Sequence, residues 1–385
     1  MIPEALKKFD RFQDVVKEMA ICRKYGIDYS LEKGDVGKFI NRYHPSSLNL
    51  KVAEVIPETL TTKTIRLVSQ DRYLPPFQAG QYISVAVEVE GIRTSRPYSL
   101  SSPPNQTGYY DITVRRVADG LISNYLLDEL KPGDLLRTSG PEGHFYYNPL
   151  FHDQTMVCLA GGSGVTPFMS MIQQIVDCGL ERTVYLFLGS PDLDQAVFHA
   201  RLTAIAARHG NIHYVPVIEN PPQDFSGHRG LITGDLIQQV LGDVSGKTFY
   251  ICGPQAMYDF CLPQLRHMGV PARKIRKESY GAPLRVWEQA GWPYEVKPQE
   301  TFEVRVKGGG SFSAPAGETL LTSLEKNGLL VPSLCRSGEC SQCRVKLLTG
   351  KVFQPAGTPV RRSDAKFGYV HSCVSYPLEN LEILL

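Results

Sequence analysis

Four cysteines in the last part of the chain have the residue type and the spacing needed to hold a metal centre. Three follow the pattern C-x4-C-x2-C and one comes later: Cys335, Cys340, Cys343 and Cys373. Small residues lie between the first three: Ser337, Gly338 and Ser341. Small residues let the backbone wrap tightly, so that amide N–H groups can point at the sulfurs and stabilise their negative charge. We therefore predict a four-thiolate site in this loop.

The spacing is the plant-type pattern for a [2Fe–2S] cluster, in which four thiolates hold two irons. A structural zinc site also uses four cysteines, but zinc motifs favour paired C-x2-C knuckles, which fit this spacing poorly. A disulfide framework fits less well still, because five more cysteines are scattered in apolar segments, as in reduced intracellular proteins. These five are Cys22, Cys158, Cys178, Cys252 and Cys261. The pattern indicates an electron carrier.

The segment around the cysteines predicts strands at 301–306, 310–314 and 381–385, with a short helix at 318–327. It resembles a plant-type ferredoxin domain over residues 301–385, an α+β fold of the β-grasp type. The resemblance implies that all four cysteines are ligands of a [2Fe–2S] cluster.

Bulk composition excludes several classes of protein. The formal net charge is only +2 over 385 residues, so nothing favours a nucleic-acid or other polyanionic partner. No apolar run approaches the roughly 20 residues that span a bilayer, and the first residues lack the apolar core of a signal peptide. We expect a cytoplasmic, multidomain protein with no membrane span, and its oligomeric state stays open.

Residues 1–48 are expected to form a helical N-terminal extension. Apolar side chains recur at helical spacing within residues 4–25, and Gly26 is a natural stop. Such a helix can pack on its own protein or a dimer mate, or it can dock an electron acceptor. The pattern does not decide between these roles.

Residues 49–149 predict an antiparallel β-barrel, because short β-rich runs are separated by Gly and Pro. The runs are 51–56, 61–69, 81–88, 109–116 and 135–139. An arginine such as Arg96 can bind a phosphate through two parallel hydrogen bonds, while Tyr98 can cover a flat ring and Ser99 can hydrogen-bond a ring heteroatom. Gly120 opens a helix whose backbone N–H groups can meet a pyrophosphate.

These residues resemble, in type and order, the flavin domain of the ferredoxin–NADP reductase superfamily. The matching motifs are Phe77-x-x-Gly80-Gln81, Arg96-x-Tyr98-Ser99, Val114-Arg115-Arg116 and Gly120-x-x-Ser123. The resemblance implies that Arg96 and Ser123 hold flavin phosphate, Tyr98 flanks the isoalloxazine ring and Ser99 lies near its N5. It also places Val114, Arg115 and Gly120 among the cofactor-binding residues. The Gly-x-x-Ser segment is more similar to the FAD branch than to the FMN branch, so FAD is expected.

Residues 150–282 alternate between strand and helix, which implies a parallel sheet with both faces covered. One of the helices is expected near 194–207. The first strand leads into Gly161-Gly162-Ser163-Gly164-Val165-Thr166-Pro167, with Thr166 expected as the N-cap of the following helix. Backbone N–H groups there can receive a nucleotide pyrophosphate. A glycine turn made only for tight packing is the alternative.

Together with Cys252-Gly253-Pro254 after a later strand, this turn resembles the nicotinamide domain of the same superfamily. The resemblance implies that Gly162, Gly164, Thr166 and Pro167 meet the dinucleotide, and that Cys252, Gly253 and Pro254 lie beside the nicotinamide. Cys252 has an ordinary buried thiol as its alternative role. Glu278 and Tyr280 lie where relatives carry an acidic and an aromatic residue over the flavin. The expected catalytic group is therefore Ser99, Cys252, Glu278 and Tyr280.

Two aspartates bear on the choice of nicotinamide. Asp192 and Asp194 follow the second strand of this domain, where an arginine would grip the 2′-phosphate of NADPH. Carboxylates repel a phosphate and accept hydrogen bonds from ribose hydroxyls, so NADH is favoured, with NADPH left possible.

Residues 283–300 are expected to form a linker whose tryptophans can pin it to a neighbouring domain.

Nicotinamide gives up two electrons as a hydride, whereas a [2Fe–2S] cluster takes one at a time, and flavin can connect the two. From about residue 50 onward the chain resembles reductases with a C-terminal ferredoxin domain. Those of phthalate dioxygenase, phenylacetyl-CoA epoxidase, vanillate demethylase and the hybrid-cluster protein are examples. We expect an oxidoreductase that passes electrons from NADH through FAD and the cluster to a separate metalloprotein, an oxygenase by the first hypothesis. The alternative acceptor is a non-oxygenase metal, hybrid-cluster or corrinoid protein, and a redox sensor without turnover is a third hypothesis.

Overall fold

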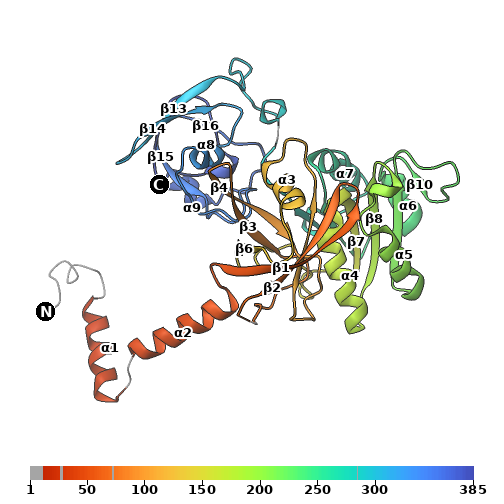
Figure 1. Cartoon of the computed structure of the whole chain (residues 1–385), viewed down its shortest axis with the longest axis horizontal. Coiled ribbons are helices and arrows are strands. Elements are labelled where there is room, and N and C mark those ends of the chain that lie inside the picture. The colour runs from red at the N-terminus through yellow and green to blue at the C-terminus, as the bar shows by residue number, and fades with distance from the viewer. Residues whose placement is uncertain (1–11, 27–28, 72, 284) are drawn as a thin grey trace. The chain divides into compact units, whose positions relative to one another are not determined.

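The computed structural model describes residues 12–26, 29–71, 73–283 and 285–385. The chain divides between Ser46 and Ser47 into two compact units. The first contains α1 (Phe12–Lys24) and α2 (Tyr29–Tyr43), and the second contains three large sheets and a two-stranded ribbon (Figure 1). Among the described residues, no helix is both long and apolar enough to cross a membrane.

The N-terminal extension is helical, as the sequence predicts. Helix α1 falls within the expected range 4–25 and is followed by Gly26 in the left-handed region at φ 72°, while residues 4–11 lie outside the described residues. Helix α2 was not predicted. The first unit exposes an apolar stripe on α2, at Val36, Phe39 and Ile40.

The second unit begins with a six-stranded antiparallel sheet in the order β4-β3-β6-β1-β2-β5. Its strands are β1 (Leu48–Thr59), β2 (Thr62–Ser69), β3 (Tyr82–Val89), β4 (Ile92–Ser99), β5 (Tyr110–Arg115) and β6 (Leu135–Thr138), with helix α3 (Leu121–Asp128) beside them. A bridge between Leu100 and Ile112 brings the two edges of the sheet together, which confirms the barrel. Inward-facing apolar residues such as Ile65 and Ile83 are fully buried and form its core.

Strand β4 was missing from the predicted strands although it carries Arg96, Tyr98 and Ser99. Its sequence contains Pro97, which removes a backbone donor and argues against a central strand. The structure resolves the conflict because β4 pairs with β3 and is an edge of the hydrogen-bonded order, where a proline is tolerated.

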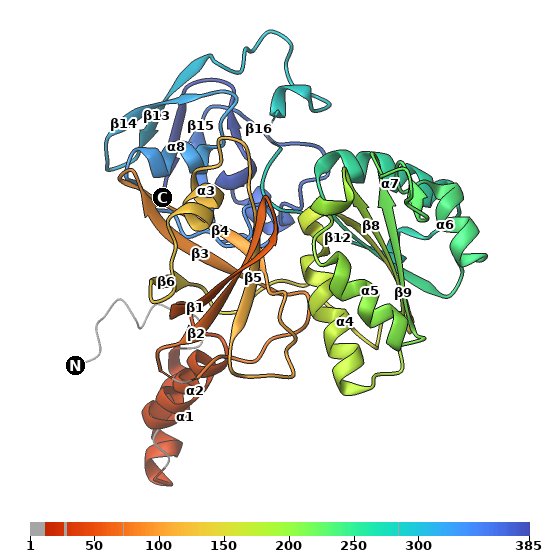
Figure 2. The same ribbon diagram turned by 45° about the vertical axis from the view of Figure 1, so that its right-hand side comes forward.

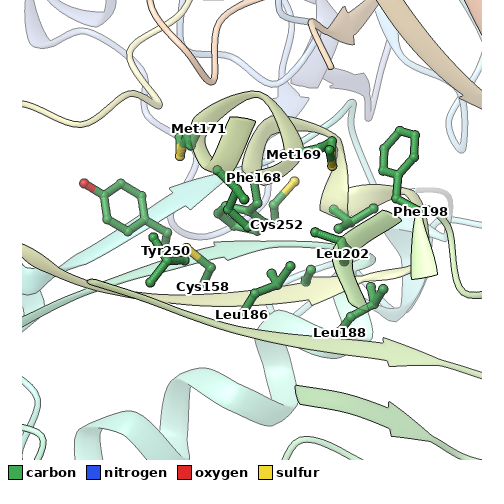
Figure 3. Close-up of a cluster of buried hydrophobic side chains, with 14 of the residues drawn as sticks. Cys158, Phe168, Met169, Met171, Leu186, Leu188, Phe198, Leu202, Tyr250 and Cys252 are labelled. Carbon is green, nitrogen blue, oxygen red and sulfur yellow. The ribbon is translucent and has the colours of Figure 1, made fainter. Parts of the chain in front are cut away.

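Next in the chain is a parallel sheet, as predicted, in the order β10-β9-β8-β7-β11-β12 (Figure 2). Its strands are β7 (Thr155–Gly161), β8 (Thr183–Ser190), β9 (Ile212–Ile218), β10 (His228–Arg229), β11 (Lys247–Cys252) and β12 (Ile275–Glu278). Its helices are α4 (Thr166–Cys178), α5 (His199–Arg208), α6 (Gly234–Leu241) and α7 (Gln255–His267). Figure 3 shows the core on one face of this sheet, with Phe168 of α4 close to Cys252 of β11.

One predicted helix begins later than expected. The sequence suggested a helix near 194–207, but Leu193–Gln195 form a separate 3-10 turn and α5 starts at His199. The interruption is Phe198, whose φ of 62° lies in the left-handed region and cannot continue a helix.

The last sheet is mixed and has the order β14-β13-β19-β15-β17, in which β13 and β19 are parallel. Its strands are β13 (Thr301–Val306), β14 (Ser311–Pro315), β15 (Arg344–Thr349), β17 (Tyr369–His371) and β19 (Leu381–Leu384). Helix α8 (Leu320–Lys326) packs its buried Leu320 and Leu324 on this sheet, and α9 (Arg362–Lys366) precedes β17. A two-stranded ribbon pairs β16 (Val352–Phe353) with β18 (Tyr376–Pro377). The arrangement confirms the β-grasp fold.

Part of the predicted linker packs against this last domain. Trp292 lies 5.2 Å from the Phe353 ring, edge-on, and its indole N–H donates to the Val296 carbonyl at 3.0 Å. The Tyr376 hydroxyl donates to the Pro283 carbonyl at 3.1 Å. Trp287, in contrast, is 39% exposed. One of the two tryptophans therefore pins the linker, and the segment is stiffer than its composition suggests.

We predict that Trp292→Ala destabilises the ferredoxin domain by about 1–3 kcal/mol, because it removes an edge-on aromatic contact and opens a cavity beside Phe353. Denaturant unfolding followed by near-UV circular dichroism measures the change. Trp287→Ala is the matched control and should shift stability by less than about 0.5 kcal/mol, since its side chain is exposed. Equal effects of the two substitutions would contradict the pinning.

Candidate electron-transfer site

The cysteine loop between α8 and β15 has the backbone that the small residues suggested. Arg336, Gly338 and Ser341 all have positive φ, at 55°, 87° and 58°. This winding turns backbone N–H groups inward, and the Cys335 sulfur accepts hydrogen bonds from the N–H groups of Ser337 at 3.4 Å and Cys340 at 3.3 Å. Such donors stabilise a thiolate, so the loop fits an anionic metal–sulfur group.

The four cysteines lie in two hydrogen-bonded pairs. The Cys340 thiol lowers the pKa of Cys335 to about 5, and the Cys373 thiol lowers the pKa of Cys343 to about 7. Within the described ranges, no three or more His, Cys, Asp or Glu side chains are arranged to hold a single metal ion. Four thiols in two pairs match the number of protein ligands that a dinuclear iron–sulfur centre requires.

A buried histidine that the sequence analysis did not single out supports this loop. His371 has no exposed surface, and its Nδ1 lies 2.7 Å from the Gly338 carbonyl while Nε2 lies 2.9 Å from Asp364 Oδ2. The histidine hydrogen bond lowers the pKa of Asp364. His371 therefore links the loop to α9, and its position two residues before Cys373 was the only signal in the sequence.

Ser99, Cys252 and Tyr280 come together from three separate segments, as predicted for the catalytic group. The hydroxyls of Ser99 and Tyr280 are hydrogen-bonded, and the Cys252 thiol lies 3.7 Å from the Tyr280 hydroxyl. Burial raises the pKa of Cys252, and it also raises the pKa of Tyr280, although that side chain is 39% exposed overall. Both groups are thus neutral at ordinary pH.

Glu278 joins this group through the sheet. It is the last residue of β12 and pairs in register with Cys252 of β11, and only 5% of it is exposed. Burial and the nearby Glu339 carboxylate raise its pKa, while Arg276 partly opposes them. Since Glu339 belongs to the cysteine loop, the nicotinamide-domain edge and the cluster loop are electrostatic neighbours.

The glycine turn packs too closely for any side chain. A Cβ on Gly164 would lie 2.0 Å from the Cys252 carbonyl oxygen, and one on Gly162 would lie 2.4 Å from the Arg115 guanidinium. The turn therefore touches the strand end at Gly253 on one side and the flavin domain on the other. Tight packing requires glycine at Gly164, where the close atom belongs to the backbone, and the positive φ of 54° favours glycine at Gly162.

The N-cap expected at Thr166 is wrong. Gly162–Val165 form a 3-10 turn that runs directly into α4, so the N-cap is Val165 and Thr166 is already inside the helix. Its hydroxyl donates to the Ser163 carbonyl at 2.6 Å, and Pro167 is the second residue of the helix rather than the first.

At the other candidate phosphate site, Gly120 is the N-cap of α3, and no side chain among the described residues caps that helix. Its first N–H groups can therefore meet a phosphate. The Ser123 hydroxyl points back to the Gly120 carbonyl at 3.4 Å. Val114 is fully buried in the barrel core, so only its backbone can contact a cofactor.

Arg96 contacts groups on its own strand. Its guanidinium donates to the Thr94 hydroxyl at 3.0 Å and to the Ser95 carbonyl at 2.8 Å. Burial and the neighbouring Arg336 lower the pKa of Arg96 to about 10, so it stays cationic at neutral pH. Tyr98 follows on the same strand and packs against the barrel core.

The acidic segment after β8 is held in place locally. The Gln195 amide donates to the Asp192 carboxylate at 2.7 Å, and the Ser190 hydroxyl donates to the Asp192 carbonyl at 2.9 Å. Asp194 is exposed. Both aspartates lie at the carboxyl end of a strand that pairs with β7, the strand leading into the glycine turn.

All nine cysteines are free thiols, which agrees with the rejection of a disulfide framework. Four of the five cysteines outside the loop are buried, but Cys178 at the end of α4 is exposed. The expectation of apolar surroundings was therefore wrong for Cys178.

Family models cover most of the second unit. Residues 47–147 match an oxidoreductase FAD-binding domain, residues 158–262 an oxidoreductase NAD-binding domain, and residues 304–378 a 2Fe-2S iron-sulfur cluster binding domain. Residues 1–46 precede the first of these matches. The three domain types define an iron–sulfur flavoprotein oxidoreductase.

Relatives share this whole arrangement. NADH oxidoreductase HCR of Escherichia coli K12 is 30% identical over 335 residues, covering 86% of this chain and 96% of that protein. The glycine betaine monooxygenase reductase subunit of Chromohalobacter salexigens is 28% identical, covering 87% of this chain and 94% of that protein. The structure of phthalate dioxygenase reductase matches with a TM-score of 0.65 at 26% identity, covering 88% of this chain and 97% of that one. The chain belongs to the ferredoxin–NADP reductase superfamily, in the branch with a C-terminal [2Fe–2S] ferredoxin domain.

We predict that Gly338→Ala reduces retention of the iron–sulfur cluster. Alanine at φ 87° is strained by about 1–2 kcal/mol, and its Cβ would lie 3.0 Å from the Thr358 methyl and 3.1 Å from a Val374 methyl. Iron and sulfide content per chain and the visible absorption of the purified protein measure the loss.

Gly357→Ala is the matched control, because Gly357 has a similar φ of 81° but nothing within 4 Å of its added Cβ. It should retain the cluster as the unchanged protein does. If the two variants lose iron equally, backbone strain alone is responsible and the close packing around Gly338 is not.

Proposed function

We propose that this chain is the reductase component of a multicomponent oxygenase system, taking electrons from NADH through FAD and a [2Fe–2S] cluster to a separate metalloprotein. The observation that carries the proposal is that residues of all three domains meet in one compact unit. Ser99 of the flavin domain contacts Tyr280, whose neighbour Cys252 ends a strand of the nicotinamide domain, and Glu278 lies close to Glu339 of the cluster loop.

The proposed binding roles follow this geometry. Arg96, Arg115, Ser123 and the backbone at Gly120 and Val114 hold the flavin, with Tyr98 and Tyr280 beside its ring and Ser99 near its reactive edge. Gly162, Gly164, Thr166 and Pro167 receive the dinucleotide, and Cys252, Gly253 and Pro254 lie beside the nicotinamide. Cys335, Cys340, Cys343 and Cys373 hold the cluster.

The side chains of this site orient one another and exclude water. When bound, flavin supplies the conversion of a two-electron hydride donor into single electrons. Ser99 and Tyr280 fix each other through their hydrogen bond, and Cys252 stays a neutral thiol because its pKa is raised by burial. Glu278, whose pKa is also raised, can hold a proton close to Cys252.

The relatives support an oxygenase as the acceptor, since several are named as reductase parts of monooxygenases. The Escherichia coli relative is named as an NADH oxidoreductase without reference to an oxygenase, which favours a non-oxygenase metal, hybrid-cluster or corrinoid protein as the second candidate.

We also propose that the protein works in the cytoplasm, where reducing conditions keep the five cysteines outside the cluster site as thiols. The proposed domain limits are 1–48 for the N-terminal extension, 49–149 for the flavin domain and 150–282 for the nicotinamide domain. The linker 283–300 and the ferredoxin domain 301–385 follow.

The test of this function is an anaerobic titration with NADH, followed by visible absorption and electron paramagnetic resonance. About one and a half NADH per chain should reduce both centres, because flavin takes two electrons and one [2Fe–2S] cluster takes one. Cys340→Ser should abolish the reduced-cluster signal and leave flavin reduction by NADH intact. Loss of flavin reduction in that variant would show that the domains do not act as separate modules.

The acidic segment predicts a preference for NADH. We expect kcat/KM for NADH to exceed that for NADPH by at least about tenfold, since a carboxylate near the 2′-position repels the phosphate. Asp192→Asn keeps the size and the contact with Gln195 but removes the charge, so it should reduce the preference roughly fivefold, as one screened charge is worth about 1 kcal/mol.

Asp224→Asn is the matched control, because Asp224 is another exposed acid of the same domain. It should leave the ratio of the two kcat/KM values unchanged. A preference for NADPH in the unchanged protein would overturn the assignment of this segment.

A further inference from the structure

A buried polar network joins the flavin domain to the ferredoxin domain. At its centre is Thr94 of β4, which is 8% exposed and was not singled out in the sequence. Its hydroxyl lies 3.0 Å from Glu325 Oε2, to which it donates, and it accepts from Arg336 Nη2 at 2.9 Å and from Arg96 Nη1 at 3.0 Å. A threonine hydroxyl has one proton and two lone pairs, so these three contacts use its full capacity.

The network reaches the cluster loop directly. Arg336 follows the ligand candidate Cys335, is 6% exposed and forms an ion pair with Glu325 of α8. Its backbone is left-handed at φ 55°, a conformation that a residue with a side chain keeps only when its surroundings hold it there. The hydrogen bonds of its guanidinium group to Glu325 and Thr94 keep the backbone in this conformation, and Thr94 belongs to the flavin domain.

The network also reaches the flavin site. Thr94 and Arg96 are two residues apart on one strand and therefore face the same side of it, as their hydrogen bond shows. The buried guanidinium group of Arg336 and the partly buried one of Arg96 face a single carboxylate, that of Glu325, which leaves one positive charge in excess. A flavin phosphate held by Arg96 would balance that charge.

We propose that the Thr94 hydroxyl is a positioning group that fixes the cluster loop against the flavin-binding strand and so sets the path for single-electron transfer. Each transfer oxidises the flavin by one electron and reduces the cluster by one, and no bond in the network forms or breaks. This inference rests on the proposed order of electron flow from flavin to cluster.

Removing the hydroxyl takes one hydrogen bond from each of three charged groups, although the ion pair between Arg336 and Glu325 remains. In Thr94→Val the shape is kept, but Arg336 loses its hydrogen bond to the flavin domain, and its Nε already has no hydrogen-bond partner among the described residues. The loss of a hydrogen bond by a buried charged group is costly, so water enters or the loop shifts. A displacement of about 1 Å is enough to slow a positioned reaction strongly.

The experiment uses the full chain with both centres loaded. Stopped-flow mixing with NADH resolves flavin reduction from the later cluster reduction. Thr94→Val should leave the first rate unchanged and slow the second roughly tenfold. Thr94→Ser keeps the hydroxyl and should restore the second rate to within about twofold.

Ser95→Ala is the matched control at the same contact. Ser95 also bonds across the domains, but only through a half-buried hydroxyl 3.3 Å from that of Ser333. Its removal should change the transfer rate by less than about twofold, because a partly exposed neutral hydrogen bond contributes little. Glu325→Gln removes the negative charge on the ferredoxin side of the network. The slowing of transfer in the double variant with Thr94→Val should be smaller than the sum of the effects of the two single substitutions.

A second measurement does not depend on electron flow. Limited proteolysis within residues 283–300 should be faster in Thr94→Val than in the unchanged protein or Thr94→Ser, because a loosened ferredoxin domain exposes its linker. Wild-type transfer rates together with wild-type cleavage in Thr94→Val would overturn the proposal. If NADH never reduces the cluster in the unchanged protein, the proposed function fails, and the cleavage comparison alone decides whether Thr94 holds the domains together.

Discussion

The junction of the three domains is governed by the cost of burying charge. Burial and the neighbouring Arg336 disfavour the charged form of Arg96 and so lower its pKa. Burial and the neighbouring Glu339 disfavour the charged form of Glu278 and so raise its pKa. Groups of both signs thus lie in the same region, and the charged form of each is disfavoured there. Buried charge of this kind is tolerated when it is paired or bound to a ligand. A flavin with its phosphates is a ligand with the matching charge for Arg96.

Close packing of backbone sets a second constraint on the same region. A Cβ on Gly164 would clash with the backbone carbonyl of Cys252, and one on Gly162 would displace the end of the Arg115 side chain. The close approach of Gly162 spans the boundary between the flavin and nicotinamide domains. The glycine motif therefore brings the two domains into close contact, and the same missing side chains suit the phosphate-binding role proposed for it.

Local motifs made the domains and the candidate ligands predictable from the sequence. Cysteine spacing, the glycine turn and the alternation of strands are all properties of short segments, and the structure confirms the three folds they indicated. Three local features were predicted wrongly. Pro97 argued against the edge strand β4, and Phe198 interrupts a predicted helix. A 3-10 turn before α4 places the N-cap at Val165 instead of Thr166.

The contacts between domains could not be predicted in the same way. Thr94 and Arg336 are separated by 242 positions, and nothing in either segment indicates the other. His371 likewise contacts the Gly338 carbonyl of the cysteine loop from the end of β17. Polar groups that satisfy one another across a fold have no spacing rule, because only the tertiary structure brings them together.

The linker explains why such a small polar network can hold a domain. Trp292 and Pro283 tie the linker to the ferredoxin domain near Phe353 and Tyr376, so the chain between the domains has little slack. A tethered domain experiences an effective concentration on the order of millimolar, and a polar contact too weak to join separate proteins is then sufficient. Polar contacts of this kind are typical between domains of one chain and permit motion. The covalent tether brings the cluster close to the flavin strand, and the Thr94 network fixes its orientation there.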